Sequence, residues 1–251
     1  GPVVAVFVST QISTVWGLLL AAAFMFGGGL WFTLSPEVGR IRVPPARRRF
    51  GVVLARPTVV ISTVLTFFFA VAFAAIEAGI VAAFGHEGLE AGIILAVFSV
   101  GSIVGGFLLG HRDVRPLSLL WFTLIVLAGT ALCLVSLNPV WLAAVLFFGG
   151  IGTAPFFAAS LSVVSSTVKF SETAEAYGWV STGMLVGVAI GSASAGIAID
   201  LLGATGGVLV SVGLLVITAL LALVSARWVP DLRGRDASPI ADTSPVHLPL
   251  P

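Results

Sequence analysis

One acidic side chain, that of Glu77, lies deep inside a long apolar stretch of the sequence, residues 58–83. At 1.5 Å per residue of α-helix, Glu77 would sit about 10 Å outward of the middle of this stretch. An ionised carboxylate in hydrocarbon costs roughly 2.5 kcal/mol or more unless it is paired, protonated or facing water. Burial favours the neutral acid, which makes Glu77 a candidate proton carrier. The alternative is a structural carboxyl group near the outer interface that hydrogen-bonds to a neighbouring helix.

Polar and aromatic residues share a helix face with Glu77. At 100° per residue, one stripe within an arc of roughly 60° contains Ser62, Thr66, Phe73 and Glu77. Residues 140–166 carry a comparable stripe made of Gly149, Thr153, Phe156 and Ser160. Both stripes are predicted to bind a proton or a small-molecule substrate. The alternative is that each hydroxyl group only bonds to the backbone carbonyl one turn earlier, as is common in membrane helices.

The segment 140–166 also contains a sequence that should interrupt its helix, GGIGTAPFF at 149–157. Pro155 lacks a backbone N–H and the glycines soften the preceding turn, so a kink is expected. The predicted hinge residues are Gly149, Gly150, Gly152 and Pro155. Such a break either forms part of a gate or serves packing alone.

These residues require a scaffold that crosses a lipid bilayer. Hydrophobic residues make up 58% of the 251-residue chain and charged residues only 9%, and the mean hydropathy is +1.15, which excludes a water-soluble protein. A membrane-spanning helix needs roughly 20 apolar residues. Seven stretches come close to this length or exceed it: 15–34, 58–83, 89–110, 117–136, 140–166, 174–200 and 205–228. The sequence therefore predicts an all-α, polytopic membrane protein.

The basic residues determine the predicted orientation of these helices. All 12 Lys and Arg residues fall in alternate connections or in the C-terminal tail, and the connections near 84–89, 137–140 and 201–204 contain none. Under the positive-inside rule the basic connections are cytoplasmic. We therefore predict a multi-pass protein of the inner cell membrane with a cytoplasmic C-terminus.

The sequence lacks the residue patterns that enzymes, metal sites and nucleic-acid-binding proteins need. The single Cys133 and three scattered histidines give no metal-ligand spacing, and the sequence has no Ser/His/Asp constellation, Walker loop or dinucleotide fingerprint. A net charge of +1, with basic residues spread over loops, gives no sign of nucleic-acid binding. We predict no enzyme activity, no cofactor and no metal, and the expected partners are membrane lipid and a small molecule.

Two of the apolar segments carry glycines at the spacing of a helix face. They are Gly101, Gly105, Gly106 and Gly110 in residues 89–110, and Gly183, Gly187 and Gly191 in residues 174–200. Small residues four apart let two helix backbones approach closely, which supports helix association in lipid. Both segments are predicted to be packing helices. Glycine-bearing helices at every third position also favour a repeat of three helices.

The order of these features resembles that in the major facilitator superfamily of membrane transporters. Gly1-Pro2 looks like part of the antiporter motif in the fifth helix of that family. Residues 36–56 are similar to its central cytoplasmic loop, and residues 174–200 to the eleventh helix of bacterial drug and sugar efflux members. The resemblance implies the last seven helices of a twelve-helix transporter, preceded by the end of its fifth helix.

A loop motif contributes to the same resemblance. The sequence GGFLLGHRDVR at 105–115 is similar to a degenerate second copy of the family's G-x-x-x-D-R-x-G-R and includes Arg112, Asp113 and Arg115. Gly110 stands where the motif has its acid, and Asp113 comes three residues later. The charge relay of the first copy therefore cannot be transferred to this chain.

The family architecture implies a division of roles among the helices. Residues 58–83 and 140–166 would line a central cavity, while 89–110 and 174–200 would face the other bundle. The predicted domains are the end of an N-terminal bundle, a cytoplasmic linker, a C-terminal six-helix bundle and a disordered tail, at residues 1–34, 35–57, 58–228 and 229–251.

The predicted function is secondary active transport by alternating access, most simply proton-coupled efflux of a small amphipathic compound. The expected partner is the missing N-terminal bundle or a second copy of the chain. One alternative is a half-size transporter that dimerises around the cavity. Another is a membrane receptor or scaffold that has a transporter fold but does not transport.

Overall fold

The computed structural model describes residues 14–35, 51–85, 89–234 and 237–240, and in this part of the chain the regular structure is helical. The long helices are α2 (Thr14–Thr33), α4 (Pro57–Phe84), α5 (Leu89–Leu109), α6 (Ser118–Leu132), α7 (Pro139–Gly150), α8 (Thr153–Ser165), α9 (Thr173–Leu202) and α10 (Ala204–Ser225). Three short 3₁₀ turns accompany them: η1 (Val52–Ala55) before α4, η2 (Phe170–Glu172) between α8 and α9, and η3 (Ala226–Trp228) after α10. Six helical segments of the described chain are long and apolar enough to cross a membrane, with α7 and α8 forming one segment. The predicted all-α polytopic fold is confirmed.

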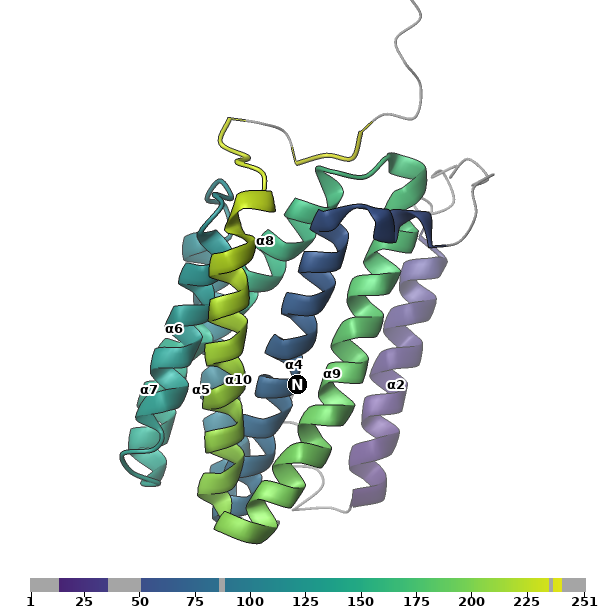
Figure 1. Ribbon diagram of the computed structural model, residues 1–251. Helices are drawn as coiled ribbons and strands as arrows, with labels where there is room; N and C mark the ends of the chain where they lie inside the picture. The colour runs from purple at the N-terminus through teal and green to yellow at the C-terminus, as the bar shows by residue number, and fades with distance from the viewer. Residues whose placement is uncertain (1–13, 36–50, 86–88, 235–236, 241–251) are drawn as a thin grey trace, which may run out of the picture.

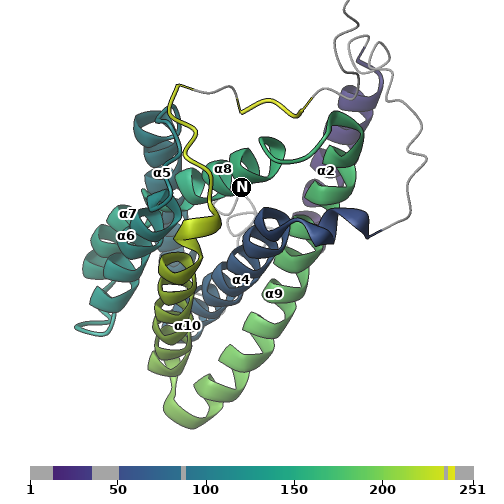
Figure 2. The same ribbon diagram turned by 45° about the horizontal axis from the view of Figure 1, so that its top comes forward.

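Helix α4 forms the centre of the bundle, as Figure 1 shows. It packs along α9 and α10 and also contacts α5 and α8, so 61% of its apolar window is buried. Helices α5 and α6 each pack on α7 at the other side of the bundle (Figure 2). Helix α2 stands at the edge, on the side of α9, and only 6% of its window is buried.

The described basic residues lie at one end of the bundle, which we call the basic end. This is the upper end in Figure 1, where α4, α6 and α9 begin and α5, α8 and α10 end. The six residues are Arg56, Arg112, Arg115, Lys169, Arg227 and Arg233. The opposite end carries Glu90 at the start of α5 and Asp200 near the end of α9. The alternation along the sequence between connections with and without basic residues therefore corresponds to a difference in charge between the two ends of the bundle.

The glycine ladders pack helices together inside this bundle. A Cβ atom at Gly187 would lie 2.5 Å from the carbonyl oxygen of Phe67, and Gly183 and Gly191 approach α4 in the same way. On α5, Gly101 and Gly105 lie against the backbone of Phe147 and Ile151, respectively. The prediction of close packing is confirmed. These glycine faces meet neighbours of their own bundle, however, and are not left for a second bundle as the family architecture implied.

We predict that Gly187→Ala lowers the stability of the protein. The added methyl group would overlap the α4 backbone, and overpacking of this kind costs about 1–3 kcal/mol. The matched control is Gly196→Ala on the same helix, where an added Cβ has no neighbour within 4 Å. Thermal unfolding in detergent should show a lower melting temperature for Gly187→Ala and no decrease for Gly196→Ala. Equal melting temperatures for the two variants would contradict the close packing of α9 on α4.

Residues 229–234 and 237–240, which belong to the predicted tail, make defined contacts with the basic end. Val229 and Leu232 are buried, and the Leu232 amide donates a hydrogen bond of 2.9 Å to the carbonyl of Val114. Further along, the Ile240 amide donates to Val168 and the Phe170 amide to Ile240, each at 3.0 Å. These apolar contacts and backbone hydrogen bonds hold residues 229–234 and 237–240 across the basic end. Residues 241–251 lie outside the described part.

Candidate functional site

Glu77 lies on the side of α4 between its contacts with α8 and α9. Ala74 packs on Gly191 of α9, and Thr66 reaches Ser160 of α8. At 100° per residue, Glu77 falls between these directions, about 60° from Ala74 and about 20° from Thr66. Its side chain is partly buried, and within the described residues it makes no hydrogen bond or ion pair. An unpaired carboxyl group therefore lies in the most buried helix of the bundle.

The two predicted polar stripes meet where α4 crosses α8. The Ser62 hydroxyl donates to the carbonyl of Ser160 at 3.4 Å, and the hydroxyl oxygens of Thr66 and Ser160 lie 3.3 Å apart. All three side chains are fully buried. We call Ser62, Thr66 and Ser160 the hydroxyl cluster. These hydroxyls bond across helices, so the alternative of bonding only to a carbonyl one turn earlier does not describe them.

Aromatic rings extend this contact. Phe156 stacks on Phe69, with ring centroids 4.1 Å apart and an interplanar angle of 10°. Phe157 meets Phe69 edge-on at 5.4 Å. Phe69 and Phe157 were absent from the prediction, although Phe69 follows Thr66 by three residues and therefore shares its helix face.

The remaining stripe residues lie elsewhere. Phe73 faces Phe98 of α5, with ring centroids 5.6 Å apart. Thr153 is buried at the start of α8, and its hydroxyl has no hydrogen-bond partner in the described structure. Glu77 is eleven residues beyond Thr66, or about 17 Å along the helix axis. The stripe was expected to form one binding surface. In the structure it is divided between the buried α4–α8 contact and a carboxyl group that lies nearer the end opposite the basic end.

The predicted interruption of the fifth transmembrane segment is confirmed, because α7 ends at Gly150 and α8 begins at Thr153. Pro155 has no N–H to donate to the carbonyl of Ile151, and that carbonyl oxygen lies against Gly105 of α5. Gly149 packs on α6, where a Cβ added at Gly129 would lie 2.5 Å from the Gly149 Cα.

The other two hinge glycines also lie against neighbouring helices. Gly150 lies against Phe98 of α5, and Gly152 against Phe122 of α6. The break is therefore held between α5 and α6 by contacts of backbone on backbone.

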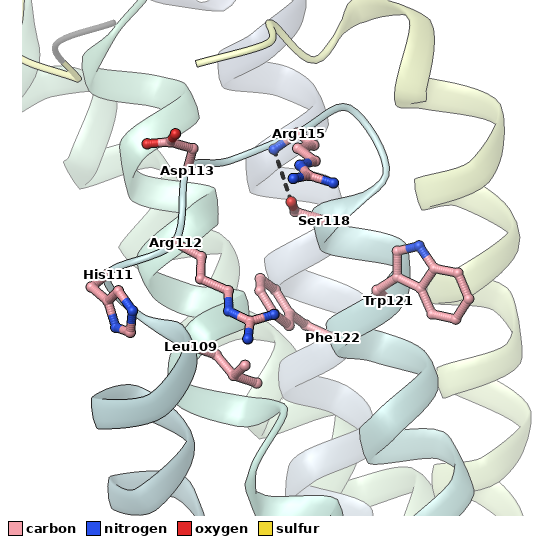
Figure 3. Close-up of a pocket in the computed structure, with 8 residues that line it drawn as sticks. All are labelled: Leu109, His111, Arg112, Asp113, Arg115, Ser118, Trp121 and Phe122. Atoms are coloured by element: carbon pink, nitrogen blue, oxygen red, sulfur yellow. Dashed lines mark hydrogen bonds between the residues drawn. The ribbon is translucent and has the colours of Figure 1, made fainter. Parts of the chain in front are cut away.

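The loop motif borders a cleft between the end of α5 and the start of α6, which Figure 3 shows in detail. The cleft has a volume of about 520 Å³, and we call it the loop cleft. Its lining residues are Leu109, His111, Arg112, Asp113, Arg115, Ser118, Trp121 and Phe122. Gly110 is exposed beside it, and Gly106 lies one turn earlier against Ala154 of α8. Sequence reasoning found the charged residues here but missed Ser118 and Trp121.

An ion pair at the basic end was not expected from the sequence. Arg56, just before α4, donates to the Glu172 carboxylate at 2.8 Å and to the carbonyl of Thr167. The Thr58 and Thr167 hydroxyl oxygens lie 2.8 Å apart beside this pair. Arg56 and Glu172 are 116 residues apart in the sequence, so no local pattern could have paired them. The pair joins the start of α4 to the connection between α8 and α9.

Apolar membrane-length helices, packed through glycine faces and interrupted beside a buried polar contact, define a multi-pass membrane bundle. The family model described as Major Facilitator Superfamily matches residues 59–247. The chain belongs to this superfamily. Comparison with curated proteins gave no match.

Proposed function

We propose that this transporter is proton-coupled and exports a small amphipathic compound by alternating access. The observation that carries the proposal is Glu77, a carboxyl group without a described partner inside the central apolar helix α4. A carboxyl group at such a depth is stable when it is protonated or faces water, and a group that alternates between these states carries a proton.

The substrate surface in this proposal is the contact of α4 with α8. The hydroxyl cluster supplies hydrogen bonds, and Phe69 and Phe156 supply an apolar wall, which together suit an amphipathic compound. The contact is closed in this conformation. Movement of α8 at Gly149–Pro155 would separate the two helices and expose it, while the glycine contacts hold α7 in place.

A second six-helix bundle completes the transporter in this proposal. Helix α9 has only 17% of its apolar window buried, against 61% for α4, so most of its surface faces outward from this bundle. The partner is either an N-terminal bundle of the same transporter or a second copy. We place the protein in the inner cell membrane with its basic end, and so its C-terminus, in the cytoplasm.

Transport in membrane vesicles tests this function. Everted vesicles that contain the full-length protein should take up the amphipathic cation ethidium when their lumen is acidified, and a protonophore should abolish the uptake. Vesicles without the protein are the control. Uptake that survives the protonophore would show that coupling to protons is wrong, and no uptake of ethidium or of uncharged amphipathic dyes would contradict export of this class of compound.

A further inference from the structure

The loop cleft combines free positive charge with an apolar wall. In Figure 3 the guanidinium group of Arg112 extends between Leu109 and Phe122, and that of Arg115 lies above Ser118. The Ser118 hydroxyl accepts a hydrogen bond of 2.8 Å from the Arg115 amide, which holds the loop on the first turn of α6. The Asp113 carboxylate is directed away from both guanidinium groups.

Both guanidinium groups are available to a ligand. Within the described chain, neither Arg112 nor Arg115 makes a side-chain hydrogen bond or an ion pair, although the charge of Arg115 contributes to the lowered pKa of the Asp231 carboxyl group. The other described arginines are engaged: Arg56 binds Glu172, Arg233 binds Asp231, and Arg227 lies 3.8 Å from the ring centroid of Trp228. The two unpaired arginines are therefore those that line the cleft.

Two features of α6 indicate that the cleft lies at the depth of lipid headgroups. Trp121 is in the first turn of α6 and is 62% exposed, and exposed tryptophans in membrane proteins gather at the boundary between headgroups and hydrocarbon. Helix α6 has 15 residues and thus a length of about 22 Å, which is shorter than the roughly 30 Å of hydrocarbon in a bilayer. A short span draws the headgroups toward it, so they approach the loop before Ser118.

We propose that the loop cleft binds the phosphodiester headgroup of an anionic phospholipid. The forked donors of Arg112 and Arg115 match the oxygens of a phosphodiester. Leu109, Trp121 and Phe122 offer an apolar wall for the glycerol and the upper acyl chains. A free phosphate ion would leave this wall unused, which is why a lipid is the occupant. The inference does not depend on proton coupling or on the substrate.

Lipid titration of the purified full-length protein in detergent tests the proposal. Native mass spectrometry would follow binding of dioctanoyl phosphatidylglycerol and, in separate arms, of dioctanoyl phosphatidylcholine and inorganic phosphate. The wild type should bind the anionic lipid most tightly. The double variant Arg112→Gln/Arg115→Gln should bind it about tenfold more weakly or worse, since each basic residue near an anionic lipid contributes substantially. Double replacement by Lys should restore part of the affinity, because charge returns without the forked donors.

The matched control is Arg227→Gln, which removes a guanidinium group beside a tryptophan at the same end of the bundle, outside the loop cleft. This variant should bind the anionic lipid as the wild type does. The proposal would be overturned by unchanged binding in the double Gln variant, by an equal loss in Arg227→Gln, or by inorganic phosphate displacing the lipid at matched concentrations. Both cleft arginines are exposed and unpaired, so the melting temperature of the double variant should equal that of the wild type.

Discussion

Glu77→Gln is expected to abolish substrate accumulation driven by a pH gradient. One pH unit corresponds to about 1.4 kcal/mol, so exchange of one proton for one substrate supports about a tenfold accumulation. Glutamine has nearly the same shape but cannot carry a proton, and the accumulation ratio should fall to about one. Downhill movement of the substrate should continue, because the α4–α8 contact is unchanged. Everted vesicles with the membrane potential clamped at zero would measure both quantities with ethidium.

Two variants serve as controls for this result. Glu90→Gln removes a carboxyl group that is exposed at the start of α5, and accumulation should stay at the wild-type value. Glu77→Asp keeps a titratable group and should retain part of the coupling. Glu77→Gln should not lower the melting temperature, because it removes an unpaired charge from a span. Accumulation by Glu77→Gln at the wild-type ratio, with unchanged pH dependence, would show that Glu77 is not the coupling residue.

Arg56→Met is expected to destabilise the basic end by about 2–4 kcal/mol, because it removes the guanidinium group that hydrogen-bonds to the buried Glu172 carboxylate. The Glu172 side chain is only 6% exposed. This expected destabilisation is toward the low side of the free-energy cost of breaking a fully buried ion pair. The reason is that the Arg56 side chain is 33% exposed, so solvent screens part of the interaction. The melting temperature in detergent would measure the loss. Arg56→Lys should be intermediate, since Lys returns the charge but not the two-pronged hydrogen bonding to Glu172 and Thr167.

Arg233→Met provides the matched comparison. The side chain of its partner Asp231 is 36% exposed, and hydrogen bonds from Arg233 hold the pKa of that carboxyl group below its ordinary value. Losing this surface pair should leave the melting temperature almost unchanged. The double variant Arg56→Met/Glu172→Met should recover much of the stability lost in Arg56→Met, because it also removes the buried carboxylate that Arg56 binds. An effect of Arg56→Met no larger than that of Arg233→Met would contradict a stabilising role for the ion pair.

The membrane topology follows directly from local properties of the sequence. Apolar length predicts each span, and Pro155 with its neighbouring glycines predicts the break between α7 and α8. The clustering of basic residues predicts that they share one end of the bundle. Each of these properties depends on a short stretch of chain and on its transfer between water and lipid, so no knowledge of tertiary contacts is needed.

Long-range contacts could not be predicted in the same way. The sequence placed Ser62 and Ser160 on polar stripes but did not show that they meet, and it did not pair Arg56 with Glu172. The sequence also did not show that residues 229–234 and 237–240 of the predicted tail meet the rest of the bundle. Composition alone could not reveal that Val114 and Val168 offer backbone partners to this segment.

The sequence by itself thus determined the class of protein, the positions of the apolar segments, the break within residues 140–166 and the candidate carboxyl group Glu77. Only the tertiary structure decided that the glycines of α9 pack on α4, that the two stripes close on each other, and that Arg112 and Arg115 border one cleft. The physical reason is that lipid is as apolar as the interior of the bundle. Hydrophobicity therefore shows that a helix is in the membrane but does not show which of its faces meets lipid and which meets another helix.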